Sequence, residues 1–179
     1  MTQSAVIVTG AASGIGYACA HDLLTDGVPV VATDIGETPA ALVNAGDCLP
    51  LSFDVSAEQS CQEAVAAATA RFGGVRALIH FAGIHHTKTW DEATGEDFAH
   101  VYAVNVTGSF LMARAAAGQM QNSGGSIVLS ASGGPAHISS KAAIRGLTRS
   151  LARSLGKYGI RVNAVSPGAN RDPDDRHLR

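Results

Sequence analysis

The stretch TGAASGIG, residues 9–16, begins at the last residue of the apolar segment AVIVT, residues 5–9. The apolar segment is rich in β-branched residues, which is typical of a buried strand, and the residues from Gly14 onward favour a helix. Glycines between a strand and a helix let a phosphate approach the free N–H groups at the helix N-terminus. The pattern therefore predicts a pyrophosphate site, with an ordinary tight turn as the alternative. The predicted binding residues are Gly10, Ser13, Gly14, Ile15 and Gly16.

A carboxylate, Asp34, follows the second predicted strand and lies 18 residues after Gly16. At this place in a dinucleotide-binding fold, a carboxylate accepts hydrogen bonds from the adenosine ribose hydroxyls and repels a 2′-phosphate. No lysine or arginine lies nearby in the sequence. The sequence therefore favours NAD over NADP as the cofactor, with a helix-capping role for Asp34 as the alternative.

Short apolar runs alternate with longer helical patterns along the chain. This alternation predicts an α/β fold with a Rossmann-type, doubly wound parallel sheet of about six strands and helices on both faces. We expect one domain over residues 1–169 and a polar, disordered tail over 170–179. The predicted strands are Ala5–Thr9, Val28–Thr33, Cys48–Phe53, Val75–Phe81, Ser126–Ser130 and Ile160–Val165. The predicted helices are Gly14–Asp26, Pro39–Ala45, Ser56–Phe72, Asp91–Val101, Val104–Gln121 and His137–Lys157. Ser56 is expected to cap the third of these helices, with Gln59 three residues on as in a capping box.

The composition limits the classes of function. The 179 residues carry a net charge of −2, so we expect no nucleic-acid partner. No apolar run is long enough to span a bilayer and no basic region precedes the first strand, which predicts a cytoplasmic protein without a membrane partner. The three cysteines and the pair His85-His86 lack the spacing of metal ligands, so we expect inert thiols and no metal site.

Several further motifs occur in a set order after the glycine loop, and together they resemble the single-domain type of the short-chain dehydrogenase/reductase family. The resemblance runs from about residue 4 to Gly168. It implies hydride transfer between a nicotinamide cofactor and a small alcohol or carbonyl substrate. The matching pieces are residues 9–16, Asp34, Asp54-Val55, Ala82-Gly83, Asn105, Ser132, Ser140-Lys141 and residues 161–168.

The resemblance also implies a role for each matching residue. In the catalytic group, Asn105 anchors a water for proton relay and Ser132 orients the substrate carbonyl. Lys141 bonds the nicotinamide ribose and lowers the pKa of its catalytic partner. The implied cofactor contacts are Asp54 and Val55 at the adenine, Ala82 and Gly83 beside the adenosine ribose, and Pro167 and Gly168 along the nicotinamide.

The catalytic motif departs from the family pattern. His137 stands where the family has its general acid/base tyrosine, four residues before Lys141. Histidine titrates near pH 6.5, so it can transfer protons, but a neighbouring ammonium would lower its pKa. The segment 133–136 between Ser132 and His137 is shorter than in the family. These changes predict a weak, altered or inactive catalytic site.

Two further departures concern the sheet and the end of the chain. Phe81, preceded by His80, replaces the family's asparagine before Ala82-Gly83, which predicts the loss of a polar contact. The chain stops soon after Gly168, a C-terminal truncation relative to the family pattern. We therefore expect the last strand to be an exposed edge and the substrate site to lack a lid.

These observations support two main hypotheses about function. The first is an NAD-dependent oxidoreductase with Asn105, Ser132, His137 and Lys141 as catalytic residues. The alternative is a non-catalytic or impaired dinucleotide-binding protein, and a third possibility is a fragment that does not fold alone. The two helices over 104–121 and 137–157 match the family's dimer-forming pair, which predicts a homodimer or homotetramer.

Overall fold

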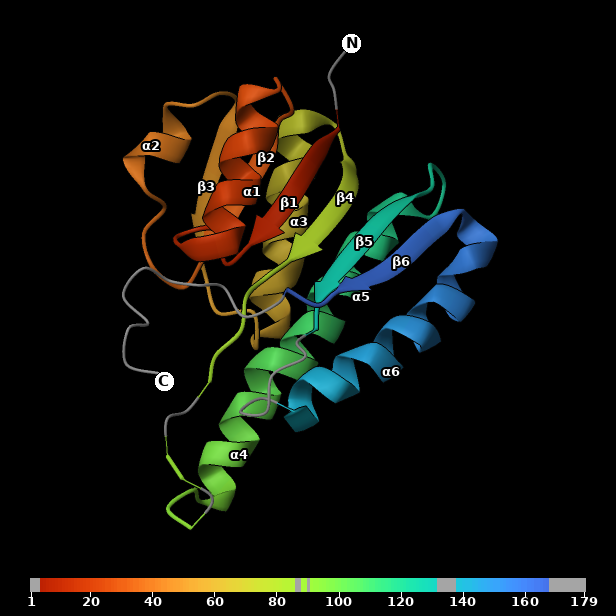
Figure 1. The fold of residues 1–179 in the computed structure, drawn as a ribbon. Coiled ribbons are helices and arrows are strands. Elements are labelled where there is room, and N and C mark those ends of the chain that lie inside the picture. Colours follow the sequence, from red (N-terminus) through yellow and green to blue (C-terminus); the bar gives the residue numbers. More distant parts are fainter. Residues whose placement is uncertain (1–3, 86–87, 90, 132–137, 168–179) are drawn as a thin grey trace.

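In the computed structural model, which describes residues 4–85, 88–89, 91–131 and 138–167, a single parallel sheet of six strands forms the centre of the fold (Figure 1). The strand order is β3-β2-β1-β4-β5-β6, and every neighbouring pair is parallel. The predicted Rossmann-type sheet is therefore confirmed. The strands are β1 (Ala5–Thr9), β2 (Val30–Asp34), β3 (Cys48–Ser52), β4 (Val75–His80), β5 (Gly125–Ser130) and β6 (Ile160–Val165).

Helices cover the sheet from both sides, as a doubly wound fold requires. The α-helices are α1 (Gly14–Thr25), α2 (Ala40–Val43), α3 (Glu58–Phe72), α4 (Gly95–Tyr102), α5 (Ser109–Met120) and α6 (Ile138–Leu155). A π-helical segment, η1 (Ala103–Gly108), joins α4 to α5, and a 3₁₀ turn, η3 (Gly156–Tyr158), follows α6. No helix among the described residues is long and apolar enough to cross a lipid bilayer.

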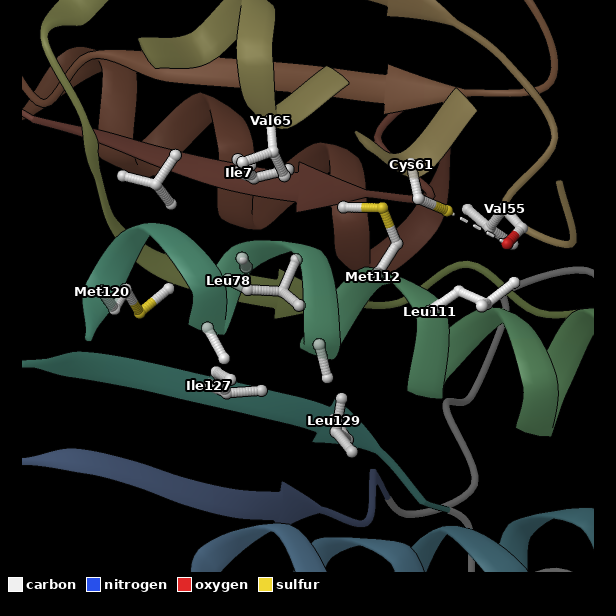
Figure 2. Packing of buried hydrophobic residues seen from close by; sticks show 14 of the residues in the cluster. Ile7, Val55, Cys61, Val65, Leu78, Leu111, Met112, Met120, Ile127 and Leu129 are labelled. Atoms are coloured by element: carbon white, nitrogen blue, oxygen red, sulfur yellow. Dashed lines mark hydrogen bonds between the residues drawn. The ribbon is translucent and has the colours of Figure 1, made fainter. Parts of the chain in front are cut away.

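The larger core lies between the sheet and helices α3, α5 and α6 (Figure 2). Its side chains include Ile7 and Leu78 from the central strands, with Met112 from α5 packed among them. A smaller core on the other face packs α1 and α2 against β1 and β2 through residues such as Val8 and Leu24. Successive side chains of β1 therefore point alternately into the two cores. Because both faces of the strand are buried, its sequence is a continuous apolar run.

The thiol of Cys61 belongs to the larger core and serves its packing. It is fully buried and donates a hydrogen bond to the Val55 carbonyl at 3.2 Å, drawn as a dashed line in Figure 2. Burial, with a smaller contribution from nearby Asp54, raises the pKa of the thiol to about 11. Because the thiolate is the reactive form, Cys61 is inert at neutral pH.

The starts of α3 and α4 differ from the sequence prediction. The capping box predicted for Ser56 and Gln59 does not form and was wrong, because α3 begins one residue after Ala57. The Ser56 N–H instead donates to the Asp54 carboxylate at 2.8 Å, which makes a tight turn before the helix. Helix α4 starts at Gly95 rather than at residue 91, and Thr94 caps it by a capping box with Asp97.

Candidate functional site

The candidate site lies at the carboxyl edge of the sheet. The strand order reverses between β1 and β4, and ligands of open α/β sheets bind outside the strand ends at such a point. Because all six strands are parallel, the loops that follow them meet at this one edge. The predicted residues on these loops and strand ends are Gly10 after β1, Asp34 in β2, Asp54 after β3, Ala82 after β4 and Pro167 after β6.

The glycine loop has the geometry that the sequence predicts for close backbone approach. Gly10 and Gly14 have φ angles of +72° and +55°, which L side chains rarely adopt. A Cβ atom on Gly16 would lie 2.0 Å from the Gly10 carbonyl oxygen, so the turn closes only with glycine at that place. A Cβ atom on Gly10 would lie 2.9 Å from the Ala82 nitrogen. The loop is therefore packed against the end of β4.

The start of α1 has the shape of a phosphate cradle. Ser13 is the N-cap residue of α1, and its exposed side chain makes no capping hydrogen bond. Among the described residues, no heavy atom other than those of its chain neighbours and its own helix backbone lies within 4 Å of the place where a Cβ atom on Gly14 would be. The Ser13 hydroxyl and the open space at Gly14 therefore fit a pyrophosphate at the helix N-terminus.

Asp34 faces the glycine loop. Its Oδ2 accepts the Ala12 N–H at 2.9 Å, and its Oδ1 accepts the Ile35 N–H at 2.8 Å. The helix-capping alternative is wrong, because α2 begins after Pro39, its N-cap residue. Ile35, which sequence reasoning did not select, is 75% exposed beside this carboxylate. The signal available in the sequence was a large apolar residue directly after a strand-ending carboxylate.

Asp54 and Val55 have different surroundings. The Asp54 carboxylate accepts the Ser56 N–H, whereas the Val55 side chain is 5% exposed and packs in the larger core. A Cβ atom on Gly108 would lie 2.8 Å from Val55 Cγ2, so the π-helical segment η1 presses directly on Val55. Val55 can therefore touch a ligand only through its main chain, while part of the Asp54 carboxylate stays accessible.

Asn105 lies in η1 and is held from several sides. Its Nδ2 donates to the Ile84 carbonyl at 2.9 Å and to Ser140 Oγ at 3.2 Å, and its Oδ1 accepts the Ile84 N–H at 2.8 Å. Ser109 Oγ donates to the Asn105 carbonyl at 2.6 Å. Single π-helical turns within longer helices often occur at functional sites. Here the turn joins Asn105 to the loop after β4 and to the start of α6.

Lys141 reaches the same region from α6. Its Nζ donates to the Ser130 carbonyl at 2.8 Å, and burial lowers the pKa of the ammonium. A Cβ atom on Gly83 would lie 3.1 Å from Asn105 Oδ1 and 3.5 Å from Lys141 Nζ. The structure therefore brings Gly83, Asn105 and Lys141 together, and a side chain at position 83 would crowd the two polar groups.

A buried polar contact joins β1 to β4 at this edge of the sheet. Thr9 Oγ1 lies 2.9 Å from His80 Nδ1 and also accepts the Ala82 N–H at 3.1 Å. Burial first, and then the Lys141 charge, lower the pKa of His80 to about 3, so its imidazole is neutral. The predicted loss of a polar contact at Phe81 is therefore offset by His80 in the preceding position. In the sequence, this contact was indicated only by a histidine at the end of an apolar strand.

Three predicted site residues, Ser132, His137 and Gly168, lie outside the described residues. Pro167 is described and is partly buried after β6. Among residues 4–85, 88–89, 91–131 and 138–167, no group of three or more histidine, cysteine or carboxylate side chains is placed to hold a metal ion.

Known proteins share both the sequence and the fold. Residues 10–178 match the sequence profile of a family described as Enoyl-(Acyl carrier protein) reductase. A short-chain dehydrogenase/reductase of Armillaria gallica is 35% identical, and the match covers 96% of this chain and 73% of that protein. The human 3-hydroxyacyl-CoA dehydrogenase type-2 is also 35% identical, over 90% of this chain and 71% of that protein.

A solved structure of a known protein has the same fold. A short chain dehydrogenase from Mycobacterium smegmatis superposes with a TM-score of 0.86 at 28% identity, covering 93% of this chain and 77% of that one. The fold and the glycine loop place the chain among the Rossmann-type proteins. With these relatives, the chain belongs to the short-chain dehydrogenase/reductase family, a family of oxidoreductases.

Proposed function

We propose that the protein is an NAD-dependent oxidoreductase that acts on a small alcohol or carbonyl substrate. The observation that carries the cofactor assignment is the position of Asp34, whose carboxylate lies 2.9 Å from the Ala12 nitrogen of the glycine loop. A carboxylate fixed there meets the adenosine ribose of a dinucleotide whose pyrophosphate lies on the start of α1. The exposed side chain of Ile35 offers apolar surface for the adenine.

The same carboxylate favours NAD over NADP. A 2′-phosphate on the ribose would bring two negative charges against Asp34, and like charges at hydrogen-bond distance repel strongly. Ser13, the loop residue beside Gly14, carries no positive charge to offset this repulsion. Other expected cofactor contacts are Gly10, Gly14, Ile15, Gly16, Asp54, the main chain of Val55, Ala82, Gly83, Pro167 and Gly168.

Lys141 and Asn105 are placed for the reacting end of the cofactor. A bound nicotinamide dinucleotide supplies hydride transfer to or from the substrate carbon. Lys141, a partly buried ammonium, would then bond the nicotinamide ribose and stabilise negative charge on a neighbouring group. We assign the substrate proton transfer to His137 and the orientation of the carbonyl to Ser132. Asn105 supports the relay.

A second candidate function is cofactor binding without turnover. It is favoured by His137 at the family's tyrosine position, because Lys141 follows four residues later and a nearby ammonium disfavours the protonated imidazole. The residues that support cofactor binding, from Gly10 to Gly83, are independent of this change.

The names of the relatives point to a class of substrates rather than to one compound. A protein of Sphingobium indicum that is 33% identical is a 2,5-dichloro-2,5-cyclohexadiene-1,4-diol dehydrogenase, and the human relative is a 3-hydroxyacyl-CoA dehydrogenase. Both names describe oxidation of a secondary alcohol, so we propose a secondary alcohol or its ketone as substrate. We also propose a homodimer or homotetramer through α5 and α6, and a cytoplasmic location.

The proposal is tested by titrating the purified protein with NADH and with NADPH. Nicotinamide fluorescence and the melting temperature should both respond to NADH in a saturable manner, and NADPH should bind more weakly. A folded protein that binds neither nucleotide would contradict both candidate functions.

Replacing Asp34 with asparagine should weaken NADH binding by about ten-fold or more, because hydrogen bonds to a charged acceptor are lost. NADPH binding should weaken less or improve, since the repulsion of the 2′-phosphate is removed. Asp26→Asn, with the same change of charge at the exposed C-cap of α1, is the matched control and should change neither affinity. Equal losses for both nucleotides in D34N would contradict the assigned ribose contact.

Replacing His137 with tyrosine separates the two candidate functions. If the protein is an enzyme weakened at this position, H137Y should raise turnover of secondary alcohols with NAD by about ten-fold or more, within the range of general acid–base catalysis. The dissociation constant for NADH should change little. Absence of turnover in both forms, with NADH binding retained, would favour the binding protein.

A further inference from the structure

A buried imidazole, that of His80, lies at the ends of the two strands that lead into the loops that we propose to hold the cofactor. Thr9 and His80 are directly paired in the register of β1 and β4, and they are 0% and 1% exposed. Thr9 Oγ1 contacts His80 Nδ1 at 2.9 Å and accepts the Ala82 N–H at 3.1 Å. The hydroxyl of Thr9 therefore joins the imidazole to the backbone of the loop after β4.

Counting donors and acceptors fixes the direction of the contact. If Thr9 donates its proton to His80 Nδ1, the hydroxyl is satisfied as donor and acceptor, and Nε2 carries the imidazole proton. If Nδ1 instead donated to Thr9, the hydroxyl proton would need another buried acceptor. Nε2 has no hydrogen-bond partner among the described residues in either case. The first arrangement therefore leaves fewer buried groups unsatisfied and is favoured.

The contact reaches both halves of the candidate site. A Cβ atom on Gly10 would lie 2.9 Å from the Ala82 nitrogen and from the Phe81 carbonyl carbon, so the glycine loop rests on the segment that Thr9 holds. The next residue, Gly83, lies against Asn105 and Lys141. A shift of the Ala82 amide would therefore move the glycine loop and crowd the polar pair.

We propose that His80 is a positioning residue for the dinucleotide: by accepting the Thr9 hydroxyl at Nδ1, it fixes the Ala82 amide and the glycine loop at the spacing that the cofactor needs. The proposal rests on the proposed dinucleotide binding and assigns a role to a residue that contacts no cofactor itself. The proposed role of His80 does not depend on whether His137, at the family's tyrosine position, supports catalysis.

Matched variants of the full chain test the proposal. His80→Phe keeps a ring but has no acceptor, and His80→Asn places an acceptor oxygen where Nδ1 stands. Thr9→Val removes the hydroxyl, and Thr9→Ser keeps it. We expect NADH affinity to fall by about ten-fold in H80F and T9V and by less than about two-fold in H80N and T9S. The double variant H80F/T9V should bind about as weakly as T9V alone, because T9V already removes the contact with His80 together with the acceptor for the Ala82 N–H.

Two measurements on the protein without cofactor complete the test. Nitrogen NMR of the labelled imidazole should show a protonated Nε2 and an accepting Nδ1 in His80. Hydrogen exchange of the Ala82 amide should accelerate by about ten-fold in H80F and return toward the wild-type rate in H80N. These readouts do not depend on whether the chain binds a dinucleotide.

The outcomes are distinguishable. A lower melting temperature in H80F with unchanged NADH affinity would make His80 purely structural and overturn the proposal. A protonated Nδ1, or strictly additive losses in H80F/T9V, would overturn it as well. If the wild-type protein binds neither NADH nor NADPH, the proposed function is wrong. The positioning role of His80 is then wrong as well, even if NMR shows the expected tautomer.

Discussion

Replacing Gly16 with alanine should destabilise the protein by about 3 kcal/mol and abolish measurable NADH binding. The added Cβ atom would lie 2.0 Å from the Gly10 carbonyl oxygen, a backbone atom that cannot rotate away. Overpacking of this kind costs about 1 to 3 kcal/mol or more. For a chain of this size, the loss corresponds to a fall of about 10 °C in the melting temperature, measured by calorimetry or circular dichroism.

A matched control for this change lies at the start of α4, away from the two helices that we propose to form the dimer. Gly95 is exposed, and among the described residues no heavy atom other than those of its chain neighbours and its own helix backbone lies within 4 Å of the place where its Cβ atom would be. Gly95→Ala should therefore leave NADH binding unchanged and should leave stability unchanged or raise it by up to about 1 kcal/mol, because alanine favours a helix over glycine. A G16A protein as stable as the wild type would contradict the close contact between Gly16 and Gly10.

The sequence was most informative where a glycine stands directly before or after an apolar run. The strands Ala5–Thr9 and Ile160–Val165 have the predicted bounds, because Gly10 follows the first and Gly159 precedes the second. Both glycines have positive φ angles, which end regular structure at a defined residue. The parallel sheet followed from the alternation of such strands with helices.

The sequence was least informative about contacts between distant residues. The pairing of Thr9 with His80 joins residues 71 positions apart, and no local periodicity encodes it. The π-helical turn at Ala103–Gly108 was also missed, because its residues fit the helical pattern of their neighbours. What distinguishes the turn is the contact of Gly108 with Val55, which depends on how α3 and α5 pack.

The candidate cofactor residues could be predicted from the sequence because each ends or follows a strand. Gly10, Asp34 and Ala82 lie at one edge of the sheet for a topological reason, since all the strands run parallel. The supporting residues are different. Ser109, which donates to the Asn105 carbonyl, belongs to no motif, and only the three-dimensional structure assigns it to the site. Ser140 belongs to the matching pair Ser140-Lys141, but its contact with Asn105 comes from the structure alone.

The stability of the folded protein should fall by about 2 kcal/mol between pH 7 and pH 5 because of His80. Burial lowers the pKa of His80 from 6.5 to about 3, with the Lys141 charge adding to the effect. In this pH range the unfolded chain binds a proton at this histidine and the folded chain does not. Each pH unit below the unfolded pKa therefore costs about 1.4 kcal/mol of unfolding free energy, until the folded pKa is reached.

Denaturant unfolding at several pH values measures this dependence, and His80→Asn is the control because asparagine does not titrate. The difference in unfolding free energy between wild type and H80N should change by about 2 kcal/mol from pH 7 to pH 5, in favour of the variant at low pH. The carboxylate of Asp97, whose pKa is lowered mainly by its hydrogen bond with Lys88, loses its contribution only at lower pH. Parallel curves for the two proteins would show that His80 is protonated in the folded state, and would place its imidazole in contact with water rather than in the sealed contact with Thr9.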